Sequence, residues 1–405
     1  MRELAPRIAD SRERDELALQ ACVALFMLGW RMGGSDEESA AVFEEGRALA
    51  EQSGDRHALA GLVGFYGLIR SQRVGSALDY VRYGEEAAAI AAETGDPALR
   101  AGIGTLPAFG HMFVGDGPAM LDWSARVLAE TGSDSALGKE ISGYSPRVSM
   151  LSNNANGLVL VGRLEEAGSA VREGERVAQE AQELEVFGWL QYVFSLRSYA
   201  GGGSEPVVDR AQHSLEIAEQ LDNESSRFVA HMTLGIAQLV DGRPADAVEA
   251  LRTSVAIARD HRSQLAWLPH AIAFQGEAHL ALGERSEALA AAREAIALAE
   301  SGGGRFYEAQ AQIVLAAALL AGAGEPPLAE IESALARAER LVESTGGRVL
   351  SPRILETRGR LAQALDDAAT TERVLHEALD LYHAIGASGH AERLGQELAS
   401  GEETR

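Results

Sequence analysis

The sequence predicts an all-α protein, an α-solenoid of about nine helix-turn-helix repeats. Three observations predict this fold. Apolar residues make up 46% of the 405 residues, much of it alanine and leucine, with 5% aromatics and 11 prolines, which is a helical composition. Short turns recur roughly every 41 residues, as they do in repeat architectures. The segments between the turns carry apolar residues at helical spacing.

The clearest repeat spans residues 267–300, where two helical patterns flank a turn at Gly283. The first pattern places apolar residues three or four positions apart, on one helix face: Trp267, Ala271, Phe274, Ala278 and Leu282. The second places small residues on a narrow face: Ala288, Ala292, Ala295 and Ala299. A face of small residues lets a neighbouring helix approach closely, so we expect a helix hairpin here.

The same turn recurs along the whole chain. The predicted turns within hairpins lie at Gly34, Gly75, Gly115, Gly162, Gly203, Gly242, Gly283, Gly324 and Asp366. Their spacings are 41, 40, 47, 41, 39, 41, 41 and 42 residues. A second set of breaks, such as Thr94-Gly95-Asp96-Pro97, separates one hairpin from the next. Glycine ends a helix and the following Asp or Ser caps the next one, so helices alternate with short turns.

These signals divide the chain into three parts. We expect an N-terminal extension over 1–14, a solenoid over 15–386, and a capping helix and tail over 387–405. The spacing stretches to 47 around 133–157, before an unusually polar helix with several Ser and Asn. A hinge with a polar inner face and a plain insertion both explain this irregularity.

Charge and cysteine content restrict the class of partner. The net charge is −24 and Lys139 is the only lysine, whereas nucleic-acid backbones need clustered Lys and Arg. We therefore expect neither nucleic acid nor an anionic membrane as a partner. A single cysteine, Cys22 in an apolar helix, allows no disulfide within the chain and favours a reducing compartment. No apolar run is long enough for a signal peptide or a membrane span, so we expect a cytoplasmic protein.

No motif for catalysis or for a cofactor is evident in the sequence. The triplets Gly201-Gly202-Gly203 and Gly302-Gly303-Gly304 follow helices rather than strands and have no lysine after them, so they are better explained as turns than as phosphate loops. His376, Asp380 and His383 share a helix face, which permits metal ligation, but a solvated face is the simpler explanation. We expect no enzyme activity, no cofactor and no metal.

The repeat resembles that of tetratricopeptide repeat proteins, which have small residues at fixed positions of both helices and a glycine near the turn. Gly276, Gly283, Ala288 and Ala295 fall at those positions. The period near 41 is longer than the 34 residues of that family, and most of its aromatic positions are missing. The longer version is similar to the C-terminal helical repeats of large bacterial signalling ATPases, both LuxR-type regulators of the maltose-regulator kind and adenylate-cyclase-like regulators. Repeats of the HEAT type have the right period and are the alternative.

This resemblance implies a right-handed superhelix whose first helices line a concave, ligand-binding face. Aromatic and cationic residues on those helices are of the types that dominate binding interfaces, although packing between hairpins is the simpler role for any one of them. The candidates for the concave face are Tyr66, Tyr144, Arg147, Asn153, Trp189, Tyr192, Arg197, Arg227, His231, Trp267, His270, Arg305 and Tyr307.

Three functional hypotheses remain. The first is a non-catalytic binding scaffold or sensor in bacterial signalling or transcriptional regulation, which holds a protein or peptide segment in an open groove. The second is the small-molecule (inducer) sensing arm of a multidomain ATPase regulator, with an enclosed apolar pocket near 144–157 and 187–200 instead. The third is an enzyme built on the repeat scaffold. Assembly into a homo-oligomer is left open by the sequence.

Overall fold

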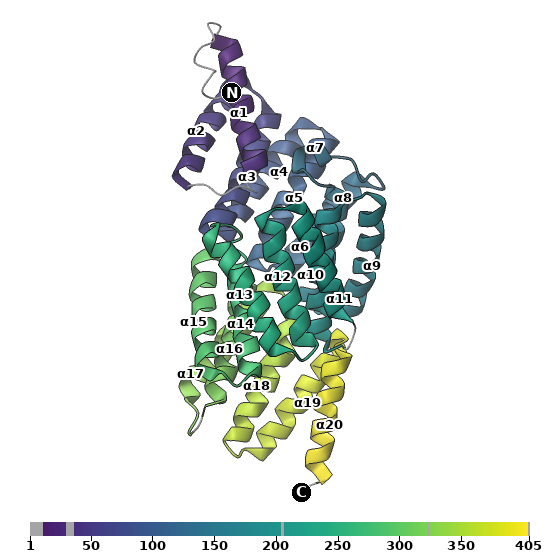
Figure 1. Ribbon diagram of the computed structural model, residues 1–405, viewed down its shortest axis with the longest axis vertical. Helices are drawn as coiled ribbons and strands as arrows, with labels where there is room; N and C mark the ends of the chain where they lie inside the picture. Colours follow the sequence, from purple (N-terminus) through teal and green to yellow (C-terminus); the bar gives the residue numbers. More distant parts are fainter. Residues whose placement is uncertain (1–10, 30–35, 204–205, 323, 404–405) are drawn as a thin grey trace.

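A computed structural model shows an elongated, all-helical molecule with the N-terminal helices at one end and the C-terminal helices at the other (Figure 1). It describes residues 11–29, 36–203, 206–322 and 324–403. Over those ranges the chain forms helices and connections with no strand. The prediction of an all-α solenoid is confirmed. Within the described ranges no helix is both long and apolar enough to cross a membrane.

The helices follow one another along the chain in antiparallel pairs. The first half comprises α1 (Ser11–Gly29), α2 (Asp36–Ser53), α3 (Arg56–Val74), α4 (Ala77–Thr94), α5 (Pro97–Val114), α6 (Gly117–Thr131), α7 (Lys139–Ser142), α8 (Pro146–Leu160), α9 (Leu164–Glu180) and α10 (Leu184–Gly201). The second half comprises α11 (Val207–Leu221), α12 (Glu224–Val240), α13 (Pro244–Asp260), α14 (Leu268–Ala281), α15 (Arg285–Gly302), α16 (Arg305–Leu320), α17 (Leu328–Thr345), η2 (Arg348–Leu350), α18 (Ser351–Ala364), α19 (Ala368–Ile385) and α20 (Ser388–Glu403).

The predicted turns separate the two helices of a pair wherever the structure describes them. Gly75 follows α3 and Gly115 follows α5, both in the left-handed conformation with φ near +80°, which glycine adopts without steric cost. In the last pair Asp366 takes the glycine's place at φ +58°. Gly34 lies outside the described residues. The exact number of repeats and the domain boundaries at 14 and 386 stay predictions. In the structure, α1 begins at Ser11 and α20 begins at Ser388.

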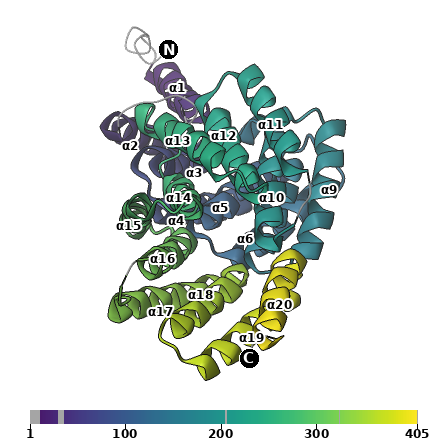
Figure 2. The same cartoon turned by 60° about the horizontal axis from the view of Figure 1, so that its bottom comes forward.

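The small residues of the second helices are buried as predicted. Ala288, Ala292, Ala295 and Ala299 on α15 are at most 1% exposed. The first helix of one pair also contacts the first helix of the next pair. For example, α10 contacts α12, and α14 contacts α16. Figure 2 shows α5, α10 and α14 toward the middle of the winding, with α9 and α15 outside. The first helices therefore converge on the superhelix axis.

The stretched interval near 133–157 contains an extra helical turn. After α6 the chain passes through α7 and reaches α8 at Pro146. Ile141 of α7 lies against Gly102 of α5, where a side chain on the glycine would clash with it. The polar residues of this stretch belong to α8, and Asn153 and Asn156 are both buried.

Successive windings of the superhelix touch along a seam. The amides of Leu265 and Ala266 donate to the carbonyls of Gln72 and Ser71 at 3.0 and 3.1 Å. Further along, the Tyr307 hydroxyl donates to the Met112 carbonyl at 3.2 Å. His390 Nε2 lies 3.0 Å from the Tyr199 carbonyl oxygen. Because the windings are in contact, side chains from opposite sides of the axis meet, and much of the inner face is packed rather than open.

Candidate functional site

Five of the thirteen predicted concave-face residues meet on the axis: Tyr144, Asn153, Trp189, Tyr192 and Trp267. Tyr144 and Trp189 pack edge to face with ring centroids 5.4 Å apart, and Phe109 lies 5.7 Å from Trp189. Tyr192 and Trp267 form a similar pair at 5.1 Å. These rings come from α5, α10 and the connections before α8 and α14. The sequence predicts that four of these rings line an open groove, whereas Tyr144, Tyr192 and Trp267 are buried and Trp189 is half-buried. The sequence does not single out Phe109.

The rings surround a central cavity of about 70 Å³. Its lining also includes Asn153 and Asn156 from α8 and contains no charged side chain. The Oδ1 atoms of both asparagines are buried without a hydrogen-bond partner. The Trp267 indole N–H lies near the Tyr192 and Tyr307 hydroxyls but finds no acceptor at hydrogen-bonding geometry. Part of its lining comes from the ranges 144–157 and 187–200, where the small-molecule hypothesis expects a pocket.

A chain of buried hydrogen bonds leads away from this cavity through His270. His270 Nδ1 donates to Gln310 Oε1 at 2.7 Å, so its Nε2 accepts from the Tyr192 hydroxyl at 3.0 Å. Gln310 in turn donates to Glu277, which accepts from Arg353 at 3.0 Å. Burial lowers the pKa of His270 to about 3 and raises that of Tyr192. Both side chains are therefore neutral near pH 7, which suits an apolar axis.

The buried neutral histidine predicts an acid-sensitive fold. Below the ordinary histidine pKa of 6.5 the unfolded chain binds a proton that folded His270 does not, so stability falls as pH drops toward 3. Between pH 7.5 and pH 5 we expect His270 to cost about 2 kcal/mol. Urea unfolding of wild type and His270→Gln at both pH values should show a smaller acid loss in the variant by about that amount. Equal losses would contradict the assignment.

Of three further predicted residues, Tyr66 packs away from the axis, Tyr307 packs beside the axial rings, and Arg197 contacts the backbone. Tyr66 stacks on Phe43 with centroids 4.1 Å apart, between α2 and α3. Tyr307 is buried at the seam, tilted against His270 at 4.6 Å. Arg197 donates from Nε to the Leu164 carbonyl at 2.9 Å, which joins α10 to the start of α9.

The remaining predicted residues lie near the surface and do not come together. Arg147 donates to the Gly132 carbonyl. Arg227 pairs with Asp222 at 2.6 Å and with Glu224 at 3.3 Å. His231 is half-buried, and burial lowers its pKa. Arg305 is exposed. These contacts join segments that are close in the sequence, so the structure gathers the aromatic candidates but not the cationic ones.

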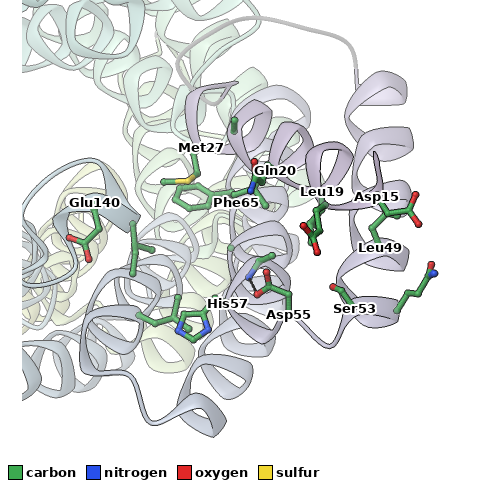
Figure 3. Close-up of a pocket in the computed structure, with 18 of the residues that line it drawn as sticks. Asp15, Leu19, Gln20, Met27, Leu49, Ser53, Asp55, His57, Phe65 and Glu140 are labelled. Atoms are coloured by element: carbon green, nitrogen blue, oxygen red, sulfur yellow. Dashed lines mark hydrogen bonds between the residues drawn. The ribbon is translucent and has the colours of Figure 1, made fainter. Parts of the chain in front are cut away.

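A much larger cavity, of about 980 Å³, opens at the N-terminal end between α1, α2, α3, α5 and α7 (Figure 3). Its apolar floor includes Leu19, Val23, Met27, Phe65 and Ile141. Figure 3 shows Glu140 on one side, Met27 and Phe65 in the middle, and Asp15 and Leu19 on the other. We call this space the N-terminal cavity.

Sequence reasoning missed the residues of the N-terminal cavity. A signal for it exists on α1, where residues at alternating steps of three and one all line the cavity: Arg12, Asp15, Glu16, Leu19, Gln20, Val23, Ala24 and Met27. That spacing is one helix face. Cys22 and Phe26 on the neighbouring face are buried against the next helices, so α1 uses one face for packing and presents the other to the cavity.

Charged groups at the C-terminal end are compensated. A hollow of about 500 Å³ there is lined by Arg353, Arg360 and Arg393. Arg353 pairs with Glu277 at 3.0 Å and Arg393 with Glu356 at 2.8 Å, while Arg360 pairs with Glu397. The hollow therefore offers no excess of positive charge. Across the described ranges no group of three or more His, Cys, Asp or Glu is arranged to hold a metal ion, and this includes His376, Asp380 and His383.

The fold places the chain among helical-repeat proteins of the tetratricopeptide-like class, and comparison with known proteins agrees. The sequence profile of the family of anaphase-promoting complex subunit 5 matches residues 8–72, 209–275 and 273–305. No curated protein matches the sequence. The crystal structure of a Rap protein complexed with competence and sporulation factor is similar, with a TM-score of 0.63 and 12% identity over 93% of this chain and 99% of that one.

A second solved structure overlaps more loosely. It is a signal transduction ATPase with numerous domains and a tetratricopeptide repeat sensor, from Pyrococcus horikoshii. The TM-score is 0.43 at 12% identity, over 90% of this chain and 55% of that chain. At these identities the Rap likeness shows a shared fold and nothing about a shared ligand.

Proposed function

We propose that this protein is a non-catalytic binding module, a helical-repeat scaffold or sensor that holds a protein or peptide segment in the N-terminal cavity. The observation that carries this proposal is the cavity itself, which is large and open and has an apolar floor supplied by inner helices. Binding sites are typically concave and mostly apolar with a few polar groups at the edge. A Rap protein of similar fold was crystallised with competence and sporulation factor, which supports a binding role for this fold.

The proposal extends to the biological setting. The resemblance to the helical repeats of LuxR-type and adenylate-cyclase-like signalling ATPases favours a role in bacterial signalling or transcriptional regulation. In that setting the module would be cytoplasmic and would act by presenting or sequestering its bound segment.

Peptide display against the immobilised protein tests the binding role. We expect selected peptides to lose at least about tenfold in affinity when Val23→Asp places a charge on the cavity floor, because burying an unpaired carboxylate is costly. Leu25→Asp is the matched control, since Leu25 is on the same helix but 50% exposed outside the cavity. Circular dichroism checks that both variants stay folded. Equal affinity of the two variants, or no selected peptide at all, would refute the proposal.

The small-molecule alternative has its own supporting observation, the central cavity with its unpartnered asparagine oxygens. Its size suits a molecule of roughly three or four heavy atoms, by comparison with an empty cavity of about 150 Å³ that binds benzene. Small molecules that raise the melting temperature of the protein without competing for display-selected peptides would favour this second function.

A further inference from the structure

We infer that the occupant of the N-terminal cavity is a basic, amphipathic segment that lies along α1 with its apolar side on the cavity floor. This inference rests on the proposed function and specifies the chemistry of the partner. Two features of the cavity carry it, the form of its apolar floor and the sign of the charge at its edge.

The floor is a stripe rather than an isolated pocket. Leu19, Val23 and Met27 succeed one another at steps of four along α1, so they form a continuous apolar row on one helix face. Leu19 is buried at the base of this row, and Val23 and Met27 are half-buried. Phe65 of α3 and Ile141 of α7 border the same space. A row of this kind is complementary to a second helix with apolar residues at i, i+3, i+4 and i+7, the pattern by which amphipathic helices bind in grooves.

The edge of the cavity is acidic. Among the described residues that line it, four carry a carboxylate, Asp15, Glu16, Asp55 and Glu140, and one carries a guanidinium, Arg12. Asp15 also pairs with Arg14 at 3.4 Å, outside the lining. Arg12 already pairs with Glu16 at 3.0 Å, and the cavity's histidine, His57, lies 3.0 Å from Asp96. The lining therefore carries a net negative charge, and so does the chain as a whole, at −24.

Complementary charge determines which amphipathic segments fit. Lys or Arg on either side of an apolar row would meet Asp15 and Glu16 on α1 or Glu140 on α7, whereas an acidic segment would be repelled at the same positions. Pairs exposed to solvent are individually weak and are screened by salt. We therefore expect the apolar row to supply most of the affinity and the acidic edge to supply the preference for basic segments.

Fluorescence anisotropy with three synthetic peptides tests this inference on the full chain. The first has leucines at i, i+3, i+4 and i+7 with Lys and Arg between them, the second replaces those cations with Glu, and the third is a scrambled form of the first. We expect the first to bind at least about tenfold more tightly than either of the others at low salt. Binding by the scrambled peptide at equal affinity would indicate unspecific attraction to an acidic protein and would overturn the inference.

Charge reversal at the cavity edge provides the matched test in the protein. Glu140→Arg is expected to weaken binding of the basic peptide about fivefold, because it removes one weak ion pair and adds one repulsion. Glu287→Arg changes the net charge by the same amount. Glu287 is exposed on α15, away from the cavity, so this variant is expected to have little effect. Equal effects of the two variants, or tighter binding of the Glu peptide, would overturn the assignment of a basic partner. If display instead selects non-basic peptides that Val23→Asp blocks, the binding function stands and only the present inference fails.

Discussion

Replacing Gly302 with alanine is expected to destabilise the protein by about 2 kcal/mol, although alanine normally favours a helix over glycine. Gly302 is the last residue of α15 and lies on the seam between windings. A β-carbon there would come well within 3.0 Å of the Gly75 carbonyl oxygen, which belongs to backbone and cannot rotate away. The windings would have to separate locally. Urea denaturation followed by circular dichroism measures the loss.

Gly201→Ala is the matched control for this prediction. Gly201 is likewise the last residue of its helix, α10, but no atom lies within 4 Å of the position that an added β-carbon would take. We expect Gly201→Ala to be neutral or to stabilise the protein by up to about 1 kcal/mol. Equal stability of the two variants would contradict the close contact between windings at Gly302.

Trp267→Ala is expected to cost about 4 kcal/mol, as large-to-small changes of a buried aromatic residue do. The indole contacts rings from three other helices, Phe113 at 5.6 Å, Tyr192 at 5.1 Å and Phe228 at 6.2 Å. Its removal would join the new void to the central cavity, and neighbours held on separate helices cannot close the space fully. Thermal and urea unfolding both measure the effect.

Trp123→Ala provides the comparison. Trp123 is half-buried on α6, with the Arg126 guanidinium 4.8 Å from its ring centroid. Because much of that ring already contacts water, we expect its removal to cost about 1 kcal/mol. A Trp267→Ala variant no less stable than Trp123→Ala would show that the axis is not a tightly packed core.

Much of the fold could be predicted because its signals are local. A turn needs a residue that tolerates positive φ, and a close helix pair needs small side chains at helical spacing. Both requirements are met within one hairpin, so Gly75 and the alanines of α15 can be recognised without any knowledge of distant contacts. Asp366 satisfies the same conformational requirement, but only the regular spacing of the repeats indicates a turn there.

The pitch of the superhelix could not be predicted in the same way. It depends on a small rotation between successive hairpins that accumulates over several of them, and no residue pattern within one hairpin encodes the sum. The pitch decides whether Trp267 faces an open groove or meets Tyr192 and Phe113 across the axis. For that reason the row of aromatic residues could be predicted, but its burial could not.

The two cavities also differ in how far the sequence predicts them. The central cavity lies where the polar helix Pro146–Leu160 faces the aromatic helix Leu184–Gly201, and the sequence suggests both segments. The N-terminal cavity depends on where α7 lies relative to α1, and nothing in the residues around Lys139 indicates that placement. In the sequence, the apolar row on α1 looks like an ordinary packing face. Only the structure shows that it borders a cavity.

The contacts along the seam also bear on how the chain folds. In an open repeat array each hairpin touches only its neighbours, so folding can start at any point and spread. Here the backbone N–H of Gln264 donates to the side-chain oxygen of Gln72, 192 residues away in the sequence. Bonds of this kind form only after a long loop has closed, which slows folding and links distant hairpins in a single event. We therefore expect the middle of the array to unfold as one cooperative unit rather than hairpin by hairpin.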